Sequence, residues 1–187
     1  MKNFNKKIKV NIISVKTKNL KKNQILSICK LKNSYWYWTI PKQLKWFKKN
    51  VKKEDINNMM MFENRLIGYN LLRKRIAYVN NKPLKYIYFD SFVLDKRMRN
   101  KSLGKKLLLF NFKTLNRIKK HSFLICKKKQ IPFYLQYGWK VLPKNRFKIV
   151  DHKSAWFKNK KEINGMIYNL DKKIKNKLYY YFNKHFY

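Results

Sequence analysis

The sequence predicts an α/β fold in which a single mixed, mostly antiparallel central sheet is flanked by helices. Segments with strand-like alternation or short apolar runs are interleaved with segments of helical period. Their order is one strand, two helices, three strands, a helix, a strand, a short helix and three further strands. The 187 residues, 45% of them hydrophobic, carry no internal repeat and no Gly/Ser linker, so we expect one core.

The first third of the chain predicts a strand and two helices. Residues 6–16 alternate as a strand does, with one face formed by Ile8, Val10 and Ile12. Residues 19–33 have helical spacing, with Asn19 as the N-cap and an apolar face of Leu20, Ile25, Ile28, Cys29 and Leu31. Pro41 suits the start of the second helix, whose apolar residues are Leu44, Trp46 and Phe47.

The middle of the chain predicts the centre of the sheet. Residues 55–75 indicate two strands joined by the turn Glu63-Asn64-Arg65. Residues 84–95 are apolar almost throughout, as in a central strand, and alternation places Asp90 on the face shared with Phe92 and Leu94. A helix with a strong apolar stripe is expected from Leu103 to Ile118.

The C-terminal part predicts smaller elements. We expect a buried strand at 122–127, a short helix at 130–138 ended by Gly138, and strands at 139–142, 146–152 and 164–170. These elements close a domain at residues 1–170. The basic, aromatic segment 171–187 is predicted to be an amphipathic helix or a frayed tail.

Composition narrows the class of protein. Cys29 and Cys126 lie far apart in apolar settings, which indicates reduced core residues in a cytoplasmic protein and no metal site. Neither a signal peptide nor a membrane-spanning segment is predicted. The net charge of +40 has two readings. The excess of Lys over Arg is typical of AT-rich codons, whereas clustered cations attract nucleic acid or an anionic nucleotide cofactor.

Residues 97–105 predict a phosphate-binding turn. A strand ends at Leu94-Asp95, a basic turn follows, and a helix begins at Leu103. The first N–H groups of a helix lack intrahelical partners, so they can bind a pyrophosphate. Gly104 allows close approach, and charge comes from Arg99, Lys101 and Lys105. The alternative is ordinary basic surface.

This turn resembles the acetyl-CoA signature of the GNAT (GCN5-related N-acetyltransferase) superfamily, Gln/Arg-x-x-Gly-x-Gly/Ala. The matching residues are Arg99, Asn100, Lys101, Ser102, Leu103 and Gly104, and the one departure is Ser102, where the signature has its first glycine. The resemblance extends over residues 8–170. It implies acetyl-CoA, or another acyl-CoA, as co-substrate, bound through 99–105 and through the backbone of Val93 and Leu94.

A second segment, 125–142, also resembles this superfamily. Its Cys126…Pro132-Phe133-Tyr134…Gly138-Trp139 form is similar to the amino-sugar N-acyltransferases. The resemblance places Tyr134 where the family has the tyrosine that protonates the CoA thiolate; a core aromatic is the alternative. The backbone N–H groups near Val93 and Leu94 would polarise the acyl carbonyl.

The general base and the acceptor pocket stay open. Asp90 is one candidate base, with a buried salt-bridge partner as its alternative role. His152, beside Asp151, is the other, with an ordinary surface histidine as its alternative. The aromatic cluster Trp36, Trp38 and Trp46 could line an acceptor pocket or simply belong to the core.

The expected function is therefore an acetyl-CoA-dependent N-acetyltransferase acting on a primary amine, with an amino sugar or sugar nucleotide as the candidate acceptor. Two alternatives remain: a basic RNA- or DNA-binding protein with this fold, and an acetyltransferase whose acceptor amine is carried by RNA.

Overall fold

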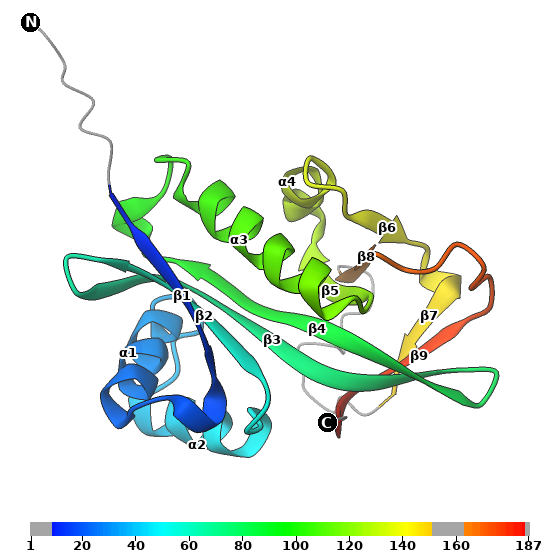
Figure 1. The fold of residues 1–187 in the computed structure, drawn as a ribbon, viewed down its shortest axis with the longest axis horizontal. Coiled ribbons are helices and arrows are strands. Elements are labelled where there is room, and N and C mark those ends of the chain that lie inside the picture. The colour runs from blue at the N-terminus through cyan, green and yellow to red at the C-terminus, as the bar shows by residue number, and fades with distance from the viewer. Residues whose placement is uncertain (1–8, 151–162, 186–187) are drawn as a thin grey trace, which may run out of the picture.

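The computed structural model describes residues 9–150 and 163–185. Figure 1 shows its elements, which follow one another as β1 Asn11–Lys16, α1 Lys22–Asn33, α2 Ile40–Asn50, β2 Ile56–Phe62, β3 Arg65–Val79, β4 Lys82–Leu94, α3 Leu103–Ile118, β5 Ser122–Lys127, α4 Ile131–Leu135, β6 Lys140–Leu142, β7 Phe147–Ile149, β8 Ile163–Tyr168 and β9 Leu178–His185. Short 3-10 turns precede α1, α3, α4 and β7.

The strands form one mixed sheet, as predicted. Its main path runs β1-β2-β3-β4-β5-β8-β6. The pairs are antiparallel except β4 with β5 and β7 with β9, which are parallel. β9 pairs with the second half of β3, beyond the point where β2 ends, and β7 lies on the outer side of β9. The mostly antiparallel sheet flanked by helices is confirmed.

Helices cover both faces of the sheet (Figure 1). On one face, α1 and α2 pack Ile28 and Phe47 against Met59, Tyr69 and Val93. On the other face, α3 and α4 bury a larger apolar layer whose members are Leu107, Leu108, Leu115 and Tyr134 with Met60, Leu72, Ile87 and Phe89. Among the described residues, no helix is long and apolar enough to span a membrane.

The predicted hairpin between β2 and β3 is confirmed, and a second hairpin was not foreseen. Glu63 and Asn64 have positive φ, as a two-residue turn of type I′ requires. Asn80 and Asn81 do the same between β3 and β4, with φ of 47° and 59°. The two turns connect β3 to its antiparallel neighbours β2 and β4, and β3 extends over 15 residues with neighbours along its whole length.

The start of α1 differs from the prediction. Asn19 lies in a 3-10 turn, and the N-cap position is Lys21. The Gln24 side-chain oxygen accepts a hydrogen bond from the Lys21 N–H at 2.9 Å. A side chain three residues into the helix therefore supplies the cap, and the Asn19 side chain is not needed for it.

The prediction for the C-terminal segment was wrong. Residues 178–185 form strand β9, neither a helix nor a frayed tail, and β9 is part of the sheet. Leu178, Tyr180 and Phe182 alternate into the core, where Tyr180 stacks on Phe123 with ring centroids 3.8 Å apart. Aromatic side chains favour the pleated surface of a strand, and the partners on β3 and β5 lie far away in the sequence. The domain therefore extends beyond residue 170.

Candidate active site

The site begins at a β-bulge in the central strand. Tyr69 pairs with Val93 and Leu71 with Asp90, so Ser91 and Phe92 together face the single residue Asn70. Ser91 takes a left-handed conformation with φ of 53°, and the Asn70 side-chain amide donates to the Asp90 carbonyl oxygen at 2.8 Å. β4 pairs with β5 only before this bulge, at Ile87–Ser122 and Tyr88–Phe123. Within the described residues, the two parallel strands therefore separate at the bulge.

Beyond the bulge, successive residues of β4 direct their backbone N–H and C=O groups alternately toward β3 and away from it. The Asp95 N–H donates to the Ile67 carbonyl oxygen at 2.7 Å, so Asp95 faces β3. Because the ladder alternates, the Val93 N–H also points to β3, and the Leu94 backbone faces away from it. The Leu94 carbonyl oxygen accepts a hydrogen bond from the Tyr35 hydroxyl at 2.8 Å. Of the two predicted carbonyl-polarising groups, only the Leu94 N–H is oriented away from β3.

The turn before α3 has the form of an anion site. Arg99, Asn100, Lys101, Ser102 and Lys105 are exposed, whereas Leu103 is buried and anchors the helix. The first helical hydrogen bond runs from the Lys106 N–H to the Ser102 carbonyl oxygen, at 3.2 Å. In the described part of the chain, the N–H groups of Leu103, Gly104 and Lys105 thus have no acceptor. The Arg99 guanidinium lies 4.9 Å from the centroid of the Tyr35 ring.

The departure from the acetyl-CoA signature now has a structural meaning. Ser102 has φ of 54° and ψ of 10°, which is the left-handed region that favours glycine. Ser102 therefore replaces the first glycine of the signature at a position where the backbone is left-handed. A serine adopts this backbone at some cost in stability. Gly104 is helical, and a Cβ placed on it would lie 3.9 Å from the Phe133 ring of α4, an ordinary contact distance.

Tyr134 lies on α4, on the same face of the sheet as α3. Its ring contacts Phe89 and Phe92 edge-on, with centroids 6.2 and 6.4 Å away, so it sits beside the bulge. It is 6% exposed, and burial raises the pKa of its phenol well above the ordinary value. The hydroxyl therefore keeps its proton at neutral pH. No hydrogen bond within the described ranges involves that hydroxyl.

Asp90 lies on the opposite face from the one predicted. It shares the α1/α2 side with Tyr88 and Val93, while Phe92 and Leu94 pack on the α3 side. The extra residue of the bulge reverses the alternation, which explains the error. The carboxylate makes an ion pair with Arg73 at 3.1 Å and accepts a hydrogen bond from the Ser91 hydroxyl at 3.0 Å. This is the salt-bridge role that the sequence had left open.

Lys32 is a buried, titratable residue near Asp90 that the sequence did not single out. It is 4% exposed, and its Nζ lies 3.5 Å from the centroid of the Trp46 ring and 5.6 Å from that of Trp36. Burial lowers the pKa of Lys32 to about 8, and the nearby Asp90 charge opposes this shift. The signal was present: Lys32 follows Ile28 and Cys29 at spacings of four and three, which places it on the apolar face of α1.

The other predicted residues divide into three groups. Trp36 and Trp46 pack against the core beside Lys32, whereas Trp38 is 44% exposed. Cys29 and Cys126 are buried free thiols. Asp151 and His152 lie outside the described residues. Within the described ranges, no cluster of three or more His, Cys, Asp or Glu side chains could hold a metal ion.

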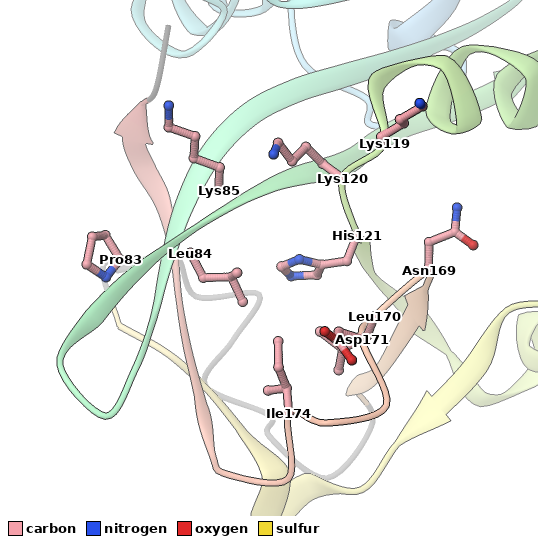
Figure 2. A pocket seen from close by; sticks show the side chains of 10 residues that line it. All are labelled: Pro83, Leu84, Lys85, Lys119, Lys120, His121, Asn169, Leu170, Asp171 and Ile174. Atoms are coloured by element: carbon pink, nitrogen blue, oxygen red, sulfur yellow. The ribbon is translucent and has the colours of Figure 1, made fainter.

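A separate cavity lies at the far end of α3 (Figure 2). It has a volume of about 420 Å³, and the buried His121 ring projects into it between Leu84 and Ile174. Lys85, Lys119 and Lys120 stand around its rim. This cavity borders the C-terminal end of α3, whereas the candidate active site is at the N-terminal end of the same helix. It is therefore not part of the candidate active site.

Comparisons with known proteins show the fold. A scan against protein-family models finds no match, and a search of curated proteins finds no relative. Among solved structures, Escherichia coli ElaA is similar with a TM-score of 0.62 and 11% identity, over 85% of this chain and 99% of that one. An acyl-CoA N-acyltransferase from Pseudomonas aeruginosa is similar with a TM-score of 0.62 and 12% identity, over 85% and 99%.

A third solved structure is the GNAT family N-acetyltransferase YhbS from Escherichia coli in complex with CoA. It is similar with a TM-score of 0.62 and 10% identity, over 92% of this chain and 90% of that one. At these identities the comparisons show the fold alone: this chain has the fold of the GNAT acyl-CoA N-acyltransferases.

Proposed function

We propose that this chain, which has the GNAT fold, transfers an acyl group from acyl-CoA to a primary amine. One observation carries the proposal: a bulged central strand separates from its parallel neighbour and leads into a helix whose first N–H groups have no acceptor among the described residues. Fold alone is weak evidence for function, because one fold serves many reactions. The groups that we assign to the reaction belong to the bulged strand β4 and to α4, and they support the proposal beyond the fold.

The turn 99–105 supports the binding of acyl-CoA. The free N–H groups of Leu103, Gly104 and Lys105 suit a pyrophosphate at the positive end of α3, and Arg99, Asn100, Lys101 and Ser102 flank them. The absence of a side chain at Gly104, where an added Cβ would lie 3.9 Å from the Phe133 ring, supports a close approach of phosphate to the backbone. YhbS, with the same fold, is a complex with CoA.

The reaction needs three groups from the protein. The acceptor ammonium must lose a proton before its nitrogen attacks the thioester carbonyl. We keep Asp90 as the candidate acceptor of that proton, directly or through water, and this role requires that it act while ion-paired with Arg73 on the α1/α2 side. The Leu94 N–H polarises the carbonyl oxygen while the N–C bond forms and the C–S bond breaks. The Tyr134 hydroxyl then delivers a proton to the departing thiolate.

We propose an amino sugar, including a sugar nucleotide, as the acceptor. The proposal rests on the resemblance of the Cys126…Tyr134…Trp139 segment to amino-sugar N-acyltransferases, and on Trp36 and Trp46, whose rings lie beside Lys32, with Trp46 also beside Arg73, the ion-pair partner of Asp90. Aromatic faces suit the apolar faces of sugar rings. An amine carried by RNA is the competing acceptor, because the net charge of +40 attracts any polyanion.

The test has two arms. Calorimetric titration of acetyl-CoA is compared with ATP at several salt concentrations, because a strongly basic protein also binds phosphate non-specifically. We expect acetyl-CoA binding to persist at a salt concentration that abolishes ATP binding, and equal salt sensitivity contradicts the proposal. Thiol release, corrected for hydrolysis, is then measured with amino sugar nucleotides, aminoacyl-tRNAs and peptides. Activity on RNA or peptides without activity on sugars contradicts the sugar assignment alone.

A further inference from the structure

The outer face of strand β9 carries aromatic and basic residues that the proposed function does not use. Leu178, Tyr180 and Phe182 point into the core, and Tyr179 and Tyr181 point the other way. Tyr179 pairs directly with Tyr78 of β3, so their side chains lie on the same face. Lys148 of β7, an exposed residue, pairs with Tyr179 from the other side. We call this surface the tyrosine face; it comprises Tyr78, Tyr179, Tyr181, Lys148, Lys177 and Lys184.

The tyrosine face borders a hollow. The hollow has a volume of about 660 Å³, and all of its lining residues are Tyr, Asn or Lys. The rings of Tyr78 and Tyr181 meet edge to face with centroids 5.4 Å apart. The Lys184 Nζ lies 4.8 and 4.3 Å from those two centroids, which holds the rings in place. Tyr179, by contrast, is 38% exposed.

The segment before β9, which borders the hollow, is held by a side-chain hydrogen bond. The Asn176 side-chain amide donates to the Asn80 side-chain oxygen at 2.7 Å, which ties the segment before β9 to the β3–β4 turn. Asn80 and Asn81 hold the positive φ values of that turn. Lys177 follows Asn176 and is exposed. The aromatic rings, Lys148 and Lys184 therefore stand on strands, and Lys177 lies directly before β9, next to the Asn176–Asn80 contact.

We propose that the tyrosine face binds single-stranded nucleic acid. Every base has a π-face that stacks on an aromatic ring without regard to sequence, and Tyr179 offers such a ring. Lys148, Lys177 and Lys184 neutralise the phosphates and release their counterions. Charge complementarity selects this ligand, since none of the lining residues is acidic and the chain carries a net charge of +40. A duplex, whose bases are stacked on one another, offers no such face.

This site is separate from the proposed acyl-transfer site. Figure 1 shows the β3–β4 hairpin and β9 at the opposite end of the sheet from the turn that opens α3. The inference therefore does not rest on the proposed function. Either one can fail while the other stands.

The test measures fluorescence anisotropy of a labelled oligouridine of about 15 nucleotides. The variant is Tyr179→Leu, chosen because Tyr179 is partly exposed and its removal leaves the core intact. We expect its Kd to rise about tenfold, whereas Tyr179→Phe keeps the ring and stays within about twofold of the wild type. Inorganic polyphosphate serves as a polyanion without bases, and its affinity should be unchanged by Tyr179→Leu.

Two matched controls distinguish binding at the tyrosine face from non-specific electrostatic binding elsewhere on the protein. Tyr37→Leu removes an 83% exposed tyrosine outside the tyrosine face. Lys177→Gln and Lys113→Gln carry the same net charge, but only Lys177 belongs to the tyrosine face. We expect Tyr37→Leu to leave the Kd unchanged and Lys177→Gln to lower the salt dependence more than Lys113→Gln. Unchanged RNA affinity in Tyr179→Leu, an equal loss in Tyr37→Leu, or an equal loss for polyphosphate overturns the proposal.

Discussion

The buried Lys32 gives the sharpest stability prediction. Its pKa is lowered by burial from 10.5 to about 8 in the folded chain. Below pH 8 both the folded and the unfolded chain carry the charge, so the folded chain bears the full cost of burying it. Between pH 8 and 10.5 only the unfolded chain stays protonated, so stability rises with pH. The difference between the pKa values of Lys32 in the folded and the unfolded chain corresponds to roughly 3 kcal/mol of stability, at about 1.36 kcal/mol per pH unit.

Lys32→Met removes the charge and keeps the length of the side chain. At pH 7 we expect it to be more stable than the wild type by about 1–3 kcal/mol, because the nearby Asp90 recovers part of the cost of burial. The gain should shrink as the pH rises toward 10. Urea unfolding of both proteins across this range measures the difference, in which the shared titration of buried tyrosines cancels.

The matched control is Lys30→Met, at an exposed position of the same helix. We expect its effect to be small and independent of pH. If the stabilities of Lys32→Met and the wild type run parallel from pH 7 to 10, the folded chain does not bury a charged lysine and the reasoning is refuted.

Three further predictions follow from the same geometry. Tyr134→Phe keeps the ring and removes the hydroxyl, so turnover should fall about 100-fold with little change in the urea midpoint; wild-type turnover would mean that Tyr134 only packs. Ser102→Gly relieves a left-handed backbone and should raise the free energy of unfolding by about 0.5–1 kcal/mol; a loss of stability would contradict that φ assignment. His121 has a pKa lowered by burial to about 4, so stability should fall as the pH drops from 6.5 toward 4 by up to roughly 3 kcal/mol. His121→Phe should flatten that pH dependence, and an unchanged slope would exclude His121 as its source.

Local patterns predicted the parts of the fold that depend on local sequence. The apolar stripe of α3 gave its bounds, Leu103 to Ile118, because the 3.6-residue period is written within the helix itself. The strand 122–127 and the turn at Glu63-Asn64 were also predicted from local sequence, the first from a short apolar run and the second from the polar break between two strand-like segments. The position of the candidate site, where a strand passes through a basic turn into α3, followed from the order of these elements.

The features that the sequence did not reveal depend on distant partners. The bulge at Ser91 is held by Asn70 and Arg73 of β3, and it moves Asp90 to the other face of the sheet. From sequence alone, the aromatic residues of β9 and the lysines around them suggested a helix. The alternation of β9 becomes clear only in the structure, where Tyr180 pairs with Ala77 and stacks on Phe123. The low pKa of Lys32 likewise follows from tertiary burial between Trp46 and the sheet.

The most direct test of the central claim is the affinity for acetyl-CoA when the side chain at position 104 is changed. Gly104→Ala adds a Cβ that makes only an ordinary contact with Phe133, and alanine favours the helix, so we expect binding to be retained. Gly104→Val adds two methyl groups over the free N–H groups and should abolish calorimetric binding while the unfolding midpoint stays near that of the wild type. If Gly104→Val folds and binds acetyl-CoA with wild-type affinity, the start of α3 does not hold the pyrophosphate and the account is contradicted.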